Sequence, residues 1–232
     1  MRKTLFLLVL LFSASHGGFS QMNSQSSYLS DFSGSIIKAN KANEDAQGSM
    51  YLNDVWCPGQ IVNMSGKQFD IARMRFNVLL NRVEYEMSGN VYELTIPYKE
   101  FSIYLPAEDG TFKVKHFKNN FPASEQQTPK SFYEIVYDGQ VKVLRHHKIR
   151  ISEHAEPLSL VRVKRFNKSS SLYIYHPQKN TVTRISKRKA DLLGVLDDKK
   201  GAVEEFMKSA KIKKNISEGD VVKVCLFYDG QS

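Results

Sequence analysis

The sequence is poor in the residues and motifs that most often carry chemistry. Its 232 residues include two cysteines, six histidines and one tryptophan. It has no G-x-S-x-G nucleophile elbow and no glycine-rich loop that would cradle a phosphate. Past residue 12, no apolar run approaches the roughly 20 residues that a membrane-spanning helix needs. These absences argue against the common hydrolases, nucleotide-binding enzymes and helical membrane proteins. The 41% hydrophobic and 25% charged residues are ordinary for a soluble domain.

The N-terminus has the pattern of a secretory signal peptide. Two basic residues open the chain, an unbroken apolar run follows at residues 5–12, and small and polar residues occupy 13–21. The run is too short for a permanent membrane anchor. We expect residues 1–20 to be removed between Ser20 and Gln21, with a second possible cleavage site near residues 13–15. The mature chain then has no transmembrane segment, and the periplasm is its expected compartment, with the extracellular space or the outer membrane as alternatives.

Positive charge is concentrated in the last part of the chain. Residues 21–140 hold 11 basic and 14 acidic side chains, whereas residues 141–232 hold 20 basic and 10 acidic ones. A charge distribution of this kind favours an anionic partner for the C-terminal part. Because the product is expected to be exported, nucleic acid is a poor candidate. Anionic lipid headgroups, an acidic glycan or an acidic protein surface fit better.

The candidate residues for contacting this partner are the basic side chains of three adjacent segments, namely Lys142, Arg145, Lys148, Arg150, Arg162, Lys164, Arg165, Arg184, Lys187, Arg188 and Lys189. On a strand over residues 141–149, alternation puts Lys142 and Lys148 on one face and Arg145 on the other. Alternation alone therefore does not make the patch continuous. The alternative interpretation is a solvated sheet edge, whose lysines discourage pairing with other chains.

The two cysteines leave two possibilities open. An oxidising compartment would allow Cys57 and Cys225 to form a disulfide. It would close a loop of about 170 residues and stabilise the chain by roughly 5 kcal/mol. Alternatively, both are buried free thiols.

The histidines do not predict a metal or cofactor site. His146 and His147 are adjacent on a predicted strand, so their side chains leave opposite faces and cannot bind one ion together. His147 and His154 with Glu153 or Glu156 do not match a zinc-binding spacing. We expect no metal and no cofactor.

The paired carboxylates do not predict an active site either. Glu84 and Glu86 share one strand face, but beside Arg82 they are typical of the solvated side of a sheet. We therefore predict a non-enzymatic protein. The alternatives are a small envelope-directed hydrolase whose site is assembled from distant residues, and a structural subunit of a cell-envelope assembly.

Period-two alternation dominates residues 50–185 and predicts an antiparallel β domain, as a meander, sandwich or open barrel. A hairpin is indicated at residues 82–96 around Ser88-Gly89-Asn90, and the apolar face changes parity near Ala72, which predicts a β-bulge or a break between two strands. Residues 21–49 are polar and predict a flexible lead-in. A polar turn is expected at residues 167–170. The remaining strands are expected at residues 60–64, 100–104, 111–117, 131–137, 141–149, 160–166, 172–175 and 181–185.

The pattern changes to a helical one after Ser186. Val203, Phe206, Met207 and Ala210 form an amphipathic stripe, with Asp197 or Asp198 as the expected N-cap. Ser217 and Asp220 have the spacing of a capping box before a further helix, although the apolar run that follows also suits a strand. The predicted fold is thus mainly β, with a small helical segment at residues 186–232 packed on the β domain, and α+β as a whole.

Several segments resemble a known family. They are the runs at residues 48–56 (GSMYLNDVW), 59–62 (GQIV) and 72–77, the pairs Leu172-Tyr173 and Leu192-Leu193, the run at residues 197–200 (DDKK), and Tyr228. Together they resemble an uncharacterised family of exported β-meander proteins from Gram-negative bacteria that has a lysine-rich helical C-terminus. The resemblance implies a fold and an exported location, but no activity, cofactor or catalytic residue. Cys57 departs from the pattern, which has an aliphatic residue there.

Overall fold

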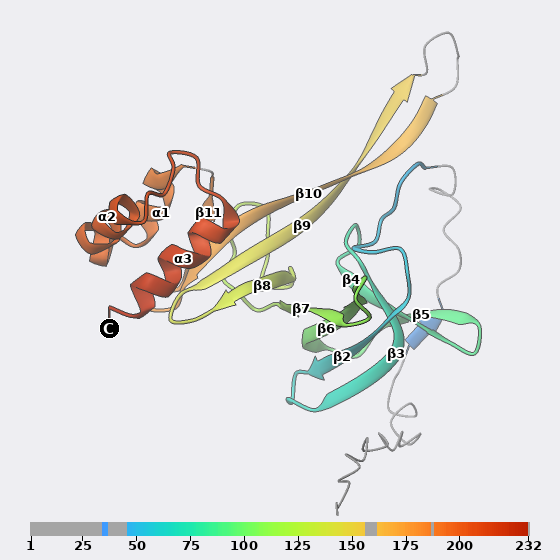
Figure 1. Cartoon of the computed structure of the whole chain (residues 1–232). Helices are drawn as coiled ribbons and strands as arrows, with labels where there is room; N and C mark the ends of the chain where they lie inside the picture. Colours follow the sequence, from blue (N-terminus) through green and yellow to red (C-terminus); the bar gives the residue numbers. More distant parts are fainter. Residues whose placement is uncertain (1–33, 37–45, 156–161, 187, 232) are drawn as a thin grey trace, which may run out of the picture.

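The computed structural model describes residues 34–36, 46–155, 162–186 and 188–231. In these residues one antiparallel sheet of eleven strands is followed by helices at the C-terminus (Figure 1). The strands are β1 (Gly34–Ile36), β2 (Cys57–Asn63), β3 (Gln68–Asn77), β4 (Arg82–Met87), β5 (Asn90–Leu94), β6 (Tyr98–Pro106), β7 (Phe112–Lys118), β8 (Tyr133–Asp138), β9 (Lys142–Ala155), β10 (Arg162–His176) and β11 (Thr181–Ile185).

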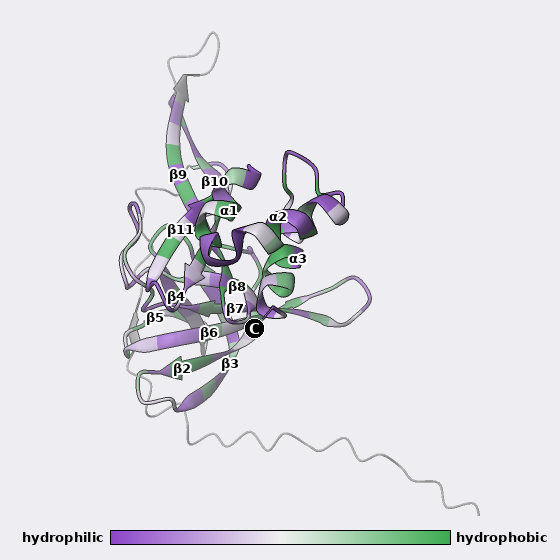
Figure 2. Ribbon diagram, turned by 90° about the vertical axis from the view of Figure 1, so that its left-hand side faces the viewer, coloured by the Kyte–Doolittle hydropathy of each residue, from purple (hydrophilic) through white to green (hydrophobic). Residues whose placement is uncertain are grey.

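The sheet is mostly a meander. Its strand order is β1-β5-β4-β3-β2-β6-β7-β8-β9-β10-β11, and every neighbouring pair is antiparallel. Figure 2 shows hydrophilic and hydrophobic residues alternating along β9, as expected for a strand whose two faces differ. The prediction of a mainly β, antiparallel fold with a small helical segment is confirmed.

Two local predictions in the first half of the sheet are confirmed. Strands β4 and β5 are joined by Ser88 and Gly89, whose φ angles of 52° and 77° are those of a tight hairpin turn. In the β2–β3 pair, Cys57 faces Met74 while Gly59 faces Ile71, so β3 contains one extra residue. This bulge at Ala72 lets the apolar side chains return to the core after the parity change.

Strands β9 and β10 form one long ribbon that extends away from the rest of the sheet (Figure 1). The predicted turn at residues 167–170 is wrong, because each of these residues pairs with one of residues 147–150 on β9. Asn167, a residue typical of turns, instead donates a hydrogen bond across the ribbon to Ser152 (Nδ2 to Oγ, 2.7 Å). The strand therefore continues through a sequence that has the composition of a loop.

The helices cover one face of the β8–β11 end of the sheet. They are α1 (Lys189–Val195), α2 (Lys200–Ser209) and α3 (Glu218–Asp229), with a 3-10 turn at Asp197–Lys199. Of the predicted stripe, Val203 and Met207 are buried and Phe206 is half-buried, whereas Ala210 lies beyond the end of α2 and is exposed. The predicted capping box is confirmed, with Ser217 and Asp220 bonding each other's backbone N–H. The predicted aspartate N-cap of α2 is wrong, because Asp197 and Asp198 belong to the 3-10 turn.

None of the helices in the described part of the chain has both the length and the apolar character required to cross a bilayer. Nor do the described residues include a group of three or more histidine, cysteine or acidic side chains placed to hold a metal ion.

The core has three parts. One lies between the helices and strands β8–β11 and contains Cys225, and a second lies among β2–β7 and contains Cys57. The third lies on the opposite face of β8–β10 and is built around Tyr133 and Tyr173. Both thiols are free, and because they belong to separate parts of the core, the possible disulfide between Cys57 and Cys225 is not formed.

Part of the expected lead-in is paired. Strand β1 lies against β5, and Gln47 forms a parallel bridge with Arg165 of β10. The predicted signal peptide at residues 1–20 and its cleavage site at Ser20 and Gln21 lie outside the described residues.

Candidate functional site

The projecting half of the β9–β10 ribbon, residues 148–155 and 162–171, is called the arm below. Its register places Lys148 opposite Ser169, Arg150 opposite Asn167, and Arg165 opposite Ser152. Opposite residues of an antiparallel pair point to the same face. Lys148, Arg150 and Arg165 therefore lie on one face of the arm, which we call the basic face.

Within the part of the chain that the structure describes, no carboxylate pairs with the cations of the basic face. The ammonium group of Lys148 donates to Gln126 (Nζ to Oε1, 2.9 Å), and Arg165 donates to Gln47 (Nη2 to Oε1, 2.9 Å). Both acceptors are neutral amides, and Arg150 is exposed. Among the described residues of the arm, no acidic side chain lies on this face, because Glu153 alternates to the other one.

The opposite face of the arm is mixed. Arg162 lies 3.8 Å from Glu153, and Lys164 is directly opposite this carboxylate in the register. Phe166 is buried, whereas Ile151 beside it is exposed. The cations of this face therefore share it with an acid and with apolar side chains.

The other predicted binding residues do not belong to the arm. Lys187 lies outside the described residues, and Lys189 begins α1, where it is half-buried. The rest form ion pairs near their own strands and helices: Lys142 with Asp138, Arg145 with Glu134 and Glu218, Arg184 with Glu125, and Arg188 with Asp191. Of the eleven predicted cations, the structure thus brings together Lys148, Arg150 and Arg165.

Arg145 belongs to a buried ionic cluster around Glu134 of β8. The Glu134 carboxylate accepts from Lys115 (Oε1 to Nζ, 2.6 Å) and from Arg145 (Oε2 to Nη1, 3.0 Å), and lies 2.6 Å from His147 Nε2. Burial opposes ionisation, but these three donors outweigh it and lower the pKa of Glu134 to about 2. Arg145 also bonds Glu218 at the start of α3, so the cluster ties the helices to the sheet.

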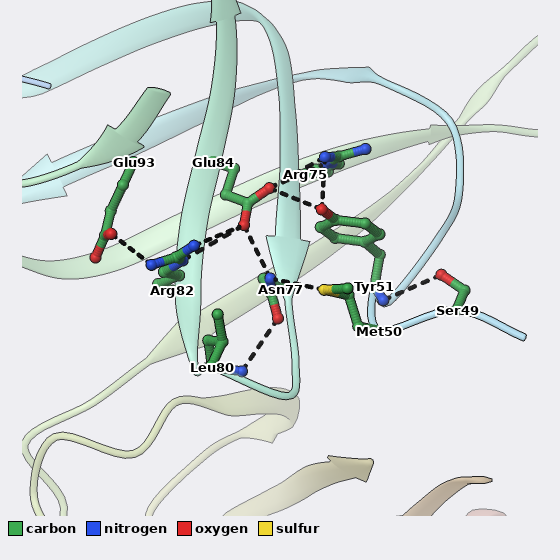
Figure 3. Close-up of polar contacts among 9 residues, drawn as sticks. All are labelled: Ser49, Met50, Tyr51, Arg75, Asn77, Leu80, Arg82, Glu84 and Glu93. Carbon is green, nitrogen blue, oxygen red and sulfur yellow. Dashed lines mark hydrogen bonds and ion pairs between the residues drawn. The ribbon is translucent and has the colours of Figure 1, made fainter. Parts of the chain in front are cut away.

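A second buried carboxylate contradicts the sequence analysis. Glu84 was expected on the solvated side of β4, but its side chain is 2% exposed. Figure 3 shows its partners converging from three segments. Oε1 accepts from Asn77 (2.8 Å), and Oε2 accepts from Arg75 Nη2 (3.1 Å) and from the hydroxyl of Tyr51 (3.0 Å).

Arg75 is fixed by aromatic rings as well as by Glu84. Its guanidinium lies 3.6 Å from the centre of the Tyr51 ring and 4.1 Å from that of Trp56. It also donates to the Tyr51 hydroxyl (Nη2 to Oη, 2.6 Å). Burial and the nearby Glu84 raise the pKa of Tyr51 to about 12, so the phenol stays protonated and donates to the carboxylate.

The segment at residues 46–54, called the strap below, covers Glu84 and connects two distant parts of the sheet. At one end Gln47 pairs with β10 (Gln47 N to Lys164 O, 2.8 Å). At the other end the strap pairs with β3 (Leu52 N to Phe76 O, 3.0 Å). The runs at residues 48–56 and 75–77, quoted above only for a resemblance, thus meet in one cluster.

No family model, no curated protein and no solved structure matches this chain.

Proposed function

We propose that this chain is exported and binds a linear anionic polymer, an acidic glycan, through the basic face of the arm, without catalysing a reaction. The observation that carries the proposal is the set of three cations on one face, Lys148, Arg150 and Arg165. Lys148 and Arg165 donate to amide oxygens, and none of the three has a carboxylate partner among the described residues. The exported compartment rests on the signal-peptide pattern of residues 1–20 and on the family resemblance.

The order of side chains along the arm favours a linear polymer. Each of three successive levels carries one cation and one neutral hydrogen-bonding group: Lys148 with Ser169, Arg150 with Asn167, and Arg165 with Ser152. Successive levels on one face of a strand are about 7 Å apart. A glycan with a repeated acid and many hydroxyl groups can use both kinds of side chain, whereas a flat lipid surface would use only the charges.

The buried carboxylates favour a binding role over hydrolysis. Glu134 is held by three cationic or imidazole donors and Glu84 by Asn77, Arg75 and Tyr51. A general acid must carry a proton near neutral pH, and the lowered pKa of Glu134 removes it from that role. These carboxylates organise arginines instead.

The test is binding to polygalacturonate, a linear polymer of carboxylate sugars. Replacing Lys148, Arg150 and Arg165 together by glutamine should weaken binding about 100-fold at low salt, since each surface cation contributes about 1 kcal/mol toward an anionic surface. The matched control replaces three exposed lysines elsewhere, Lys113, Lys213 and Lys214, and should change binding little.

Salt and a second probe complete the test. Binding should weaken as ionic strength rises, because exposed charges are screened within about 10 Å at 0.1 M salt. Equal loss in the control variant, or binding that ignores salt, would refute the basic face as the site. Binding to phosphatidylglycerol vesicles that exceeds binding to polygalacturonate would replace the glycan by a lipid surface.

A further inference from the structure

A cavity of about 660 Å³ lies where the strap, β3 and the base of the arm meet. Its walls include Asp54, Arg75, Phe166 and Lys168. Its volume falls within the range of roughly 300–1,000 Å³ of small-molecule sites. It is separate from the basic face, because Phe166 and Lys168 alternate to the other side of the arm.

The Arg75 guanidinium is oriented with one edge available. Nε and Nη2 are occupied by Glu84 and Tyr51, and no described residue accepts a hydrogen bond from Nη1. The stacking between Tyr51 and Trp56 prevents the side chain from turning away. A guanidinium fixed in this way loses little entropy when it binds an oxyanion.

Lys168 lines the same cavity as Arg75 and has two further donors. Its side chain is exposed and forms no ion pair with a described residue. The backbone N–H of Phe166 points out of the edge of β10 and donates to Gln47 O (2.9 Å). Backbone groups two residues apart in a strand point in the same direction, so the backbone N–H of Lys168 points to this side as well. The strap pairs with β10 at Gln47, and among the described residues no backbone carbonyl accepts from the Lys168 N–H.

Gly48 keeps the strap close enough to β10 to form this wall. Its φ of 89° is rarely adopted by other residues, and a Cβ atom there would lie 3.2 Å from Phe166 O. On the cavity wall Asp54 is exposed and has no ion-pair partner among the described residues. One carboxylate beside two cations disfavours ligands that carry several anionic groups.

We infer that this cavity binds a small organic molecule with a single carboxylate or phosphate group, held by Arg75 Nη1 and by the ammonium and backbone N–H of Lys168. The inference does not depend on the proposed polymer binding. A carboxylate and a phosphate share the chemistry that these donors recognise, and the experiment separates them.

The experiment titrates the full-length mature chain with glucuronate, glucose 6-phosphate and neutral glucose, following amide and side-chain NMR shifts. We expect at least one of the two anions to shift the Lys168 amide and the Arg75 side-chain signals, while glucose does not. Glucuronate alone would identify a carboxylate ligand, and glucose 6-phosphate alone a phosphate ligand. No shift with either anion at 20 mM, or equal shifts with glucose, would overturn the inference.

Two variants test the assigned residues without disturbing the fold. Lys168→Ala should weaken binding about fivefold, the effect of one exposed charge, and Asp54→Asn should strengthen it by a similar factor. Lys113→Ala is the matched control and should leave affinity unchanged. If Lys168→Ala binds as tightly as the parent, the site is not the one described. Polygalacturonate binding should be retained in Lys168→Ala, so the failures of the two proposals are distinguishable.

Discussion

Removing the charge of Glu134 tests the energetics of the ionic cluster between β8 and the helices. The cluster lowers the pKa of this carboxyl group from its ordinary value of 4.5 to about 2. At about 1.4 kcal/mol per pKa unit, the ionised form stabilises the fold by about 3 kcal/mol. This stability is fully present above pH 4.5 and is lost as the pH falls toward 2. Glu134→Gln should therefore lower the free energy of unfolding by about 3 kcal/mol at pH 7.

The assay is urea unfolding of the parent and of Glu134→Gln at several values between pH 7 and pH 2.5, followed by circular dichroism. The difference between the two chains should be constant down to about pH 5 and then shrink, because the parent gradually loses the interaction that the variant already lacks. Glu153→Gln serves as the control, since its partner Arg162 is 77% exposed and such pairs contribute little. A difference that stays constant to pH 2.5 would show that ionisation of Glu134 is not its source.

Three further predictions concern stability and reactivity. Glu84→Gln should lower the free energy of unfolding by about 3 kcal/mol or more, because it removes the carboxylate that pairs with Arg75 and leaves Arg82 with Glu93 alone; a calorimetric melting temperature within 2 °C of the parent's would contradict this. Gly139→Ala places a Cβ atom 1.9 Å from an oxygen of Asp229 and should speed hydrogen exchange in α3, whereas Gly194→Ala, which meets no atom within 4 Å, should not. Burial raises the pKa of the Cys225 thiol to about 12, so Ellman's reagent should label neither cysteine before unfolding; rapid labelling of the native chain would contradict the buried, free state.

The elements that sequence reasoning predicted correctly are those set by neighbouring residues. The hairpin at Ser88-Gly89 follows from two positions that adopt positive φ, and the capping box of α3 follows from the spacing of Ser217 and Asp220. The bulge near Ala72 follows from the shift of the apolar side chains from odd to even positions, because a regular strand would then turn them to the opposite face. In each case the deciding interaction spans only a few residues.

Apart from the N-cap of α2, the failures involve partners that are distant in sequence. Alternation alone predicts that the Glu84 side chain is exposed to solvent. Nothing in the neighbouring residues indicates that Tyr51, 33 positions earlier in the chain, covers it. Likewise, residues 167–170 have a turn composition, but pairing with β9 overrides it because the register is fixed by the apolar residues of both strands. The basic face was missed for the same reason: only the register shows that Arg165 is on the face of Lys148 and Arg150.

The Glu84 cluster is relevant to function because burying charged side chains adds little net stability to a fold. Replacing a buried ion pair by apolar residues of similar volume is often neutral or stabilising, so stability alone does not explain why Arg75, Glu84 and Arg82 occupy this place. What the cluster provides is a fixed orientation, because Glu84 and two aromatic rings hold the Arg75 guanidinium at the wall of a cavity. An apolar core would fill the same volume without presenting a donor. The arrangement therefore supports the anion-binding role that we infer for this cavity.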